Sequence, residues 1–276
     1  MRSELIRLSK AIALSIALLT GATPVGATVF SADQSNLWWN PAESGWGMQL
    51  VQQADVVFAT MFVYDAQNNP VWYTATLSPR GTNANGEDEF AGDLYLTRGP
   101  WFGQTPFDPA TVTYRKVGRL VFGSKNVEQA SLAYVIDGTA VAKTVYRQTL
   151  RNDDYSGTHM GVVTRADCSA PSCSATSMVM FAITQGPNRL VVEMPIHSQI
   201  GAGLTLCTFT GDFVQFGHFA KSQGSFTCAD GSSGTHTFEE MTAQKVGRDF
   251  PYHHLATARM TLRYANGCVS KGYFFG

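Results

Sequence analysis

Short apolar runs separated by turn residues recur about every ten residues after residue 28. The period of apolar and polar positions within them is that of β-strands, and no helical period of useful length occurs. The first half has such runs at 55–64, 71–77, 89–96 and 117–122. The second half has them at 157–165, 176–184, 189–196, 203–210, 213–219, 224–228, 235–243, 256–264 and 269–275. The pattern predicts an all-β protein with two antiparallel meander barrels or sandwiches in tandem.

The run at 55–64 is apolar at nearly every position. Alternation places Val56, Phe58, Phe62 and Tyr64 on one face and a second apolar set on the other. This composition predicts a strand that is covered on both sides. The turn DAQNNP at 65–70 then joins it to 71–77 in a hairpin.

Asp137-Gly138 lies between two alternating strands and predicts a hairpin with a type I′ turn. This turn sets the register, with the expected pairs Ile136–Thr139, Tyr134–Val141, Leu132–Lys143 and Glu128–Arg147. The last pair predicts a cross-strand charge interaction, so Arg147 is interpreted as structural rather than catalytic.

Residues 1–27 have the features of a secretory signal peptide. A basic front with Arg2, Arg7 and Lys10 precedes the apolar run 11–19, and Val25-Gly26-Ala27 supplies small residues for cleavage. Nine apolar residues are too few to cross a bilayer, which takes about 20. We therefore expect an exported mature chain, periplasmic or extracellular, with no integral membrane segment.

Cleavage would remove three basic residues and one acidic residue, which moves the formal net charge from −1 to −3. A weakly acidic chain without a Lys/Arg block lacks the electrostatic signature of a nucleic-acid-binding protein. We therefore expect no nucleic acid among its partners.

Tryptophans and cysteines divide between the two halves of the chain. All five tryptophans precede residue 102, and all five cysteines follow residue 167. The stretch TLRNDDYS at 149–156 loses apolar periodicity and is interpreted as a linker. The prediction is a Trp-rich β domain at 28–150 and a Cys-containing β domain at 151–276.

Cysteines of an exported chain usually form structural disulfides. Cys207 and Cys228 lie in apolar β-like runs at a separation suited to neighbouring strands, and we expect them to pair. Cys168, Cys173 and Cys268 then share one bond, for which Cys168–Cys268 is preferred, and one thiol remains. The spacing lacks the paired C-x2-C units of a zinc site.

Four segments, WWNPAESGWGMQL, VFATMFVYDAQNNPVWY, VGRLVF and YVIDGTAVAKTVYRQ, carry a resemblance. Together they resemble a W-x-N-P-x-E-S-G-W-G β module of secreted proteins of Gram-negative bacteria, over about residues 37 to 148. The resemblance implies export and a β architecture, and it brings no catalytic residues, because the module has no established function. Arg119 and Leu120 depart from the pattern, which favours small or hydroxyl residues there.

The aromatic residues beside turns are the strongest candidates for a binding site. Asn-Pro and Ser-Gly shape a tight lip between 37 and 50 that carries three tryptophans. These rings either plug the end of a barrel or form a surface that stacks on a ligand, and both alternatives stay open. The candidate ligand-binding residues are Trp38, Trp39, Asn40, Glu43, Trp46, Trp72, Tyr73 and Trp101.

Signals for catalysis are few. The chain has no G-x-S-x-G elbow, P-loop or dinucleotide fingerprint, so no catalytic residue is assigned and no cofactor is expected. Glu43 would be a general acid only if burial raised its pKa. All six histidines lie in the second half, where His218, His236 and Glu239 could form a metal site if their strands were adjacent. Scattered structural histidines are the commoner outcome, and no metal site is assigned.

The leading hypothesis is an exported, non-enzymatic binding protein whose aromatic lip recognises a glycan or a cell-envelope component. The alternatives are a small-molecule carrier with a barrel cavity, a secreted hydrolase, and an inhibitor or assembly partner of another secreted protein. An internal pocket would favour the carrier. An exposed apolar patch or a bare strand edge would favour a protein partner.

Overall fold

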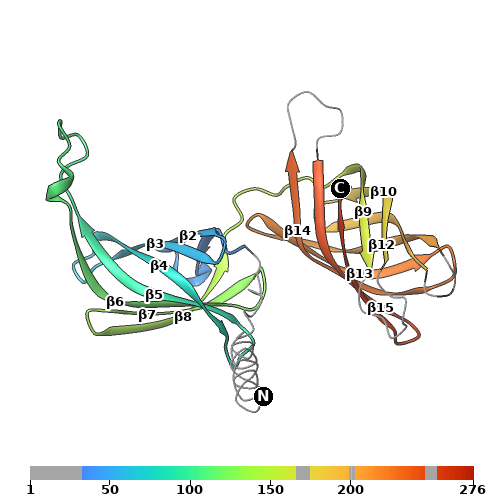
Figure 1. The fold of residues 1–276 in the computed structure, drawn as a ribbon, viewed down its shortest axis with the longest axis horizontal. Helices are drawn as coiled ribbons and strands as arrows, with labels where there is room; N and C mark the ends of the chain where they lie inside the picture. Colours follow the sequence, from blue (N-terminus) through green and yellow to red (C-terminus); the bar gives the residue numbers. More distant parts are fainter. Residues whose placement is uncertain (1–32, 166–174, 199, 201–202, 246–253) are drawn as a thin grey trace, which may run out of the picture. The chain divides into compact units, whose positions relative to one another are not determined.

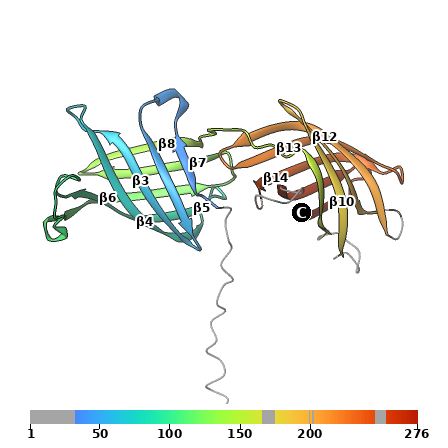
Figure 2. The same ribbon diagram turned by 90° about the horizontal axis from the view of Figure 1, so that it is seen from above.

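The computed structural model describes residues 33–165, 175–198, 200, 203–245 and 254–276. The predicted signal peptide lies outside these residues. The described chain is nearly all β and forms two closed antiparallel barrels of eight strands each, as predicted (Figures 1 and 2). No helix among these residues is long and apolar enough to cross a membrane.

The first barrel is a meander in which each strand pairs with the next, and β1 closes it on β8 through Trp38↔Arg147 and Trp39↔Tyr146. Its strands are β1 (Asn36–Trp39), β2 (Gly47–Gln53), β3 (Val56–Tyr64), β4 (Pro70–Thr82), β5 (Asp88–Arg98), β6 (Thr113–Ser124), β7 (Gln129–Ile136) and β8 (Thr139–Arg147). Two 3-10 turns, η1 (Pro41–Glu43) and η2 (Pro109–Thr111), interrupt its loops.

An eight-stranded barrel has an interior just wide enough for side chains to fill. In the first barrel these are inward-facing residues that alternate along each strand, among them Trp38, Met48, Leu50, Met61, Leu77, Leu120, Phe122 and Leu132. They are fully or almost fully buried. The interior is therefore a packed core.

The second barrel has its own core and is closed by Phe274↔Val163 between its last and first strands. Its strands are β9 (Gly157–Arg165), β10 (Ala175–Gln185), β11 (Arg189–His197), β12 (Leu204–Phe216), β13 (Phe219–Cys228), β14 (Ser233–Lys245), β15 (His254–Tyr264) and β16 (Val269–Phe275). Aromatic rings fill it, and Phe209 contacts both Phe226 and Phe238. Tyr155 of the preceding segment joins this core and donates its hydroxyl to the Met241 carbonyl (3.1 Å).

Two strand breaks in the second barrel were predicted wrongly. The break expected between 210 and 213 lies inside β12, because the chain continues through Gly211 without a turn, and the break expected between 219 and 224 lies inside β13. Gly211 lies opposite Gly224, and a Cβ on Gly211 would come within 2.5 Å of the Gln223 carbonyl oxygen. This glycine permits close backbone approach within a strand and does not mark a break.

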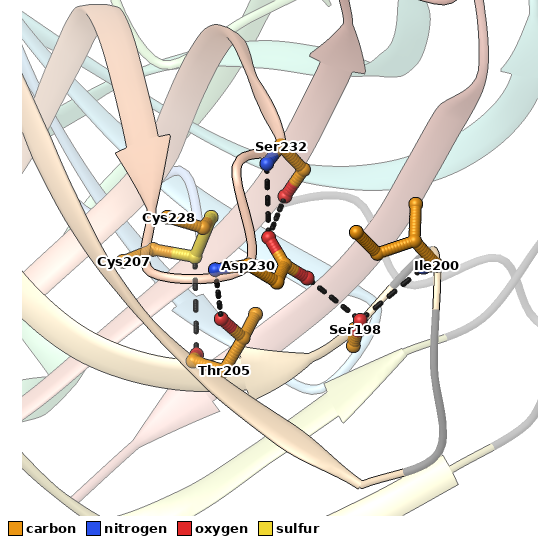
Figure 3. Close-up of a disulfide and its surroundings, with 7 residues drawn as sticks. All are labelled: Ser198, Ile200, Thr205, Cys207, Cys228, Asp230 and Ser232. Carbon is orange, nitrogen blue, oxygen red and sulfur yellow. Dashed lines mark hydrogen bonds between the residues drawn. A yellow bond between two sulfur atoms is a disulfide. The ribbon is translucent and has the colours of Figure 1, made fainter.

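The Cys207–Cys228 disulfide is confirmed and joins directly paired positions of β12 and β13 (Figure 3). The β13–β14 turn beside it is fixed by Asp230, which accepts hydrogen bonds from the Ser198 hydroxyl (2.6 Å) and the Ser232 backbone N–H (2.9 Å). These bonds hold the pKa of Asp230 below its usual range, the Ser198 bond contributing most. Asp230 is therefore an ionised anchor of the turn.

The prediction of a Cys168–Cys268 disulfide is wrong, because Cys268 is an exposed free thiol. It follows the tight β15–β16 turn, where its backbone N–H donates to Asn266 Oδ1 (3.0 Å). Cys168 and Cys173 lie outside the described residues.

The Asp137-Gly138 hairpin has the predicted register, with Ile136↔Thr139, Tyr134↔Val141 and Leu132↔Lys143. Both turn residues have positive φ, as a type I′ turn requires. The predicted charge pair between the Glu128 and Arg147 side chains does not form, although the backbone N–H of Arg147 donates to the backbone carbonyl of Glu128 (3.1 Å). The guanidinium turns inward and donates to the Asp33 carbonyl (2.7 Å) and to Gln34 Oε1 (3.1 Å).

Candidate functional site: a cavity at an open seam of the first barrel

The lip between β1 and β2 has the tight geometry that its sequence predicts. Asn40 caps η1 by accepting the Ala42 N–H (2.9 Å), and Pro41 begins the turn. Gly45 has φ +118°, a conformation that favours glycine. Asn40 therefore has a structural function in shaping the lip.

Trp38 is a core plug, so its assignment to a ligand surface is wrong. Its ring is fully buried, 5.0 Å from Phe122 in an edge-to-face arrangement. The Arg147 guanidinium lies 4.5 Å above the ring, and Nε1 donates to the Gln34 carbonyl (3.0 Å). Trp39, the next residue, is half-buried.

Trp46 and Glu43 are held together at the mouth of the barrel. Trp46 Nε1 donates to Glu43 Oε2 (2.9 Å), Lys143 forms an ion pair with the same carboxylate, and Lys143 Nζ lies 4.5 Å from the centre of the indole ring. The Lys143 bond is the largest cause that lowers the pKa of Glu43, and the Trp46 bond adds to it. Glu43 is thus an ionised anchor, which contradicts the raised pKa that a general acid would need.

Tyr73 faces the interior opposite Met61 and packs against the core. Burial is the main cause that raises the pKa of its hydroxyl, and the charge of Asp137 contributes. The lip tryptophans and Tyr73 therefore serve mainly to close the barrel end.

Trp72 differs, because its side chain points outward and is 60% exposed. It lies opposite Phe62 on β3, and Phe62 and Tyr64 are also exposed. The prediction that the 55–64 strand is covered on both faces is therefore wrong. Phe62 and Tyr64 of β3 and Trp72 of β4 form an exposed aromatic surface on the outside of the barrel.

This surface borders an opening in the barrel wall. In the described chain the β4–β5 ladder ends at Thr74↔Tyr95. Beyond that pair, Pro70–Tyr73 of β4 bonds only with β3, and Leu96–Arg98 of β5 bonds only with β6. Two strand edges with unpaired backbone groups consequently face one another, and we call this opening the seam.

A cavity of about 640 Å³ lies at the seam. It is lined by Gly45, Phe62, Val63, Tyr64, Asp65, Pro70, Val71, Trp72, Leu96, Thr97 and Arg98. This volume is within the range of small-ligand sites, which are mainly apolar with a few placed polar groups. We refer to it as the seam cavity.

Two charged groups of opposite sign lie in the lining. The Asp65 carboxylate accepts the backbone N–H groups of Asn69 (2.8 Å) and Gln67 (2.9 Å), which lowers its pKa, the Asn69 bond most strongly. Arg98 takes part in none of the ion pairs found among the described residues. The cavity therefore offers a fixed carboxylate, a guanidinium and an exposed indole.

Trp101 lies in the loop between β5 and β6, outside the residues that line the seam cavity. Its ring contacts Phe102 with centroids 5.4 Å apart, and both rings are exposed. Of the candidate residues, the structure groups Glu43 with Trp46, places Trp72 alone at the cavity and separates Trp101 from both.

The suggested histidine metal site is not formed. His236 is buried, and its Nδ1 contacts the Ser225 carbonyl (3.2 Å), while Glu239 pairs with Arg259 (2.9 Å). The described residues contain no group of three His, Cys, Asp or Glu side chains able to hold a metal ion.

Sequence reasoning missed Phe62, Tyr64, Asp65 and Arg98. Phe58, Phe62 and Tyr64 share one face of their strand, and this face was predicted to be buried. Their common face is the signal that could have identified the aromatic surface. Arg98 gave no signal, because its role depends on where the β4–β5 ladder ends.

Comparison with known proteins finds no matching family model, no matching curated protein and no matching solved structure. Function must therefore be inferred from the side chains and their geometry.

Proposed function

We propose that the protein is an exported, non-enzymatic binding protein whose first barrel recognises a glycan, free or as part of the cell envelope, in the seam cavity. The observation that carries the proposal is the exposed indole of Trp72 beside a 640 Å³ cavity that also holds Asp65 and Arg98. An aromatic face stacks on the C–H face of a sugar ring, and charged side chains bond its hydroxyls.

Export is supported by the signal-like sequence of residues 1–27 and by the Cys207–Cys228 disulfide. Disulfides persist in oxidising compartments and are rare in the cytosol. A location outside the cytosol would expose the seam cavity to envelope and extracellular glycans.

The test is a titration of the purified protein with a panel of envelope and plant glycans, in which binding is measured by tryptophan fluorescence and by calorimetry. Trp72→Ala is expected to weaken binding of a positive glycan by about tenfold or more, the scale of one lost aromatic contact. Trp101→Ala is the matched control, because it removes an exposed tryptophan outside the cavity. Equal affinity of wild type and Trp72→Ala would reject the seam cavity as the glycan site.

A second candidate is a protein partner, favoured by the unpaired edges of β4 and β5. An extended peptide can add to such an edge through main-chain hydrogen bonds and place alternate side chains in a pocket. Binding of extended peptides but of no glycan, again sensitive to Trp72→Ala, would favour this candidate.

The other two alternatives have less support. The ionised, paired state of Glu43 does not suit the hydrolase that was considered. Buried side chains such as Trp38 and Phe122 fill the barrel interior where a carrier would hold its ligand.

A further inference from the structure

The end of the β5–β6 hairpin extends beyond the barrel wall. β5 loses its β4 partner after Tyr95, and the β6–β7 ladder begins only at Gly118↔Ile136. In the segment 96–116, the strand residues 96–98 and 113–115 pair only with one another, through Leu96↔Arg115, Thr97↔Tyr114 and Arg98↔Thr113. Figure 1 shows this segment, which we call the arm, as the green hairpin that continues past the neighbouring strands.

The tip of the arm is uncharged and rich in exposed aromatic side chains. Residues 99–107 read GPWFGQTPF and include no ionisable side chain. Trp101 is 68% exposed and Phe102 is 91% exposed, and Phe107 is also exposed. Such a concentration of exposed rings usually marks an interaction surface.

The loop that carries these rings has a defined conformation. Gln104 N–H donates to the Trp101 carbonyl (2.9 Å), and Asp108 caps η2 by accepting the Ala110 N–H (3.0 Å). The rings are therefore held in solvent by ordered backbone.

Cations lie behind the tip. Arg98 ends β5, and Arg115 and Lys116 lie on β6, where they pair with Asp137 (2.6 Å) and Asp93 (2.7 Å). Behind the uncharged aromatic segment the arm therefore carries mixed charges, because Asp108 follows Phe107 directly and Arg115 and Lys116 are both paired.

We infer that the arm docks the protein on a lipid surface by inserting Trp101, Phe102 and Phe107 among the headgroups and upper acyl chains. Aromatic side chains favour the boundary between headgroups and acyl chains. A ring that is 91% exposed belongs to no groove, so a protein partner would have to supply the whole pocket, whereas fluid lipid adapts to a projecting tip. Because two of the three cations are already paired, insertion of the rings contributes more than charge.

The test is flotation of the full chain with phosphatidylcholine vesicles and with vesicles containing one third phosphatidylglycerol. Wild type is expected to float with both to a similar extent, because Asp93, Asp108 and Asp137 offset the three cations of the arm. The double variant Trp101→Ser/Phe102→Ser is expected to lose binding by tenfold or more, because each buried ring contributes roughly that factor. Trp72→Ser is the matched control and should float like wild type.

A spectroscopic measurement separates insertion from loss of structure. Brominated lipids should quench part of the tryptophan emission of wild type, and Trp101→Phe should abolish that quenching while retaining most of the flotation. The lipid inference is overturned if wild type floats with neither vesicle, or if the double variant floats as well as wild type. A protein partner would then be the alternative for the arm. Glycan binding depends on Trp72, so failure of either proposal leaves the other measurable.

Discussion

Trp38 and Trp39 are adjacent in sequence, yet their rings lie in different environments, because successive side chains of a strand point to opposite sides. Trp38 faces inward, where Phe122 and Arg147 cover it, and Trp39 remains half-buried. The same alternation separates Tyr73, inside, from Trp72, outside. Which tryptophan is available to a ligand thus depends on strand phase.

Trp38→Ala should remove the largest fully buried side chain of the first barrel. A fully buried aromatic residue cut back to alanine costs about 3 to 5 kcal/mol, because it loses transfer free energy and leaves a cavity. Urea unfolding followed by circular dichroism measures the loss. Trp39→Ala is the control and should cost less than half as much; equal small losses in both variants would contradict the plug assignment.

His236 predicts a pH dependence of stability. Burial lowers the pKa of its ring to about 4, while in the unfolded chain the pKa returns to about 6.5. Between these values the unfolded state binds more protons, so this contribution to stability is complete above about pH 6.5 and is lost as the pH falls towards 4.

Urea unfolding at pH 7, 5.5 and 4.5 tests this, with His236→Phe as the comparison, because carboxylates also titrate at the acid end. The stability of wild type should fall more steeply with decreasing pH than that of the variant. Parallel curves for the two proteins would show that His236 does not contribute.

Turn residues in the sequence were sufficient to predict the hairpins, but they could not predict the seam, which depends on contacts between strands. Asp137-Gly138 sets its own register, because a type I′ turn leaves no choice of pairing. The exposed outer face of β3 and the end of the β4–β5 ladder depend on what packs against each strand from elsewhere in the chain. For the same reason sequence reasoning nominated Trp72 but could not place Arg98 beside it.

At the level of the strands, Gly211 and Gly224 set how closely β12 and β13 approach. Gly211→Ala would place a methyl group 2.5 Å from the Gln223 carbonyl oxygen, so the pair of strands must move apart. We expect a loss of roughly 1 to 3 kcal/mol, the usual cost of overpacking. Gly186→Ala is the matched control, because its nearest contact would be 3.8 Å away; thermal unfolding that affects both variants alike would contradict the close-approach argument.

For the molecule as a whole, the separate cores predict separable unfolding. Each barrel has its own cluster of buried residues, the Cys207–Cys228 disulfide lies in the second, and all five tryptophans lie in the first. Tryptophan fluorescence therefore reports on the first barrel, while circular dichroism reports on both.

Reduction of the Cys207–Cys228 bond, which closes a loop with a sequence separation of 21, should destabilise the second barrel by about 3 kcal/mol. With a reducing agent, the circular dichroism transition should gain an earlier phase in urea while the tryptophan transition keeps its midpoint. Cys207→Ala/Cys228→Ala should reproduce this in the absence of reductant, and Cys268→Ala, which removes an exposed thiol, should not. If the tryptophan midpoint instead shifted together with the circular dichroism signal, the two barrels would unfold as one cooperative unit.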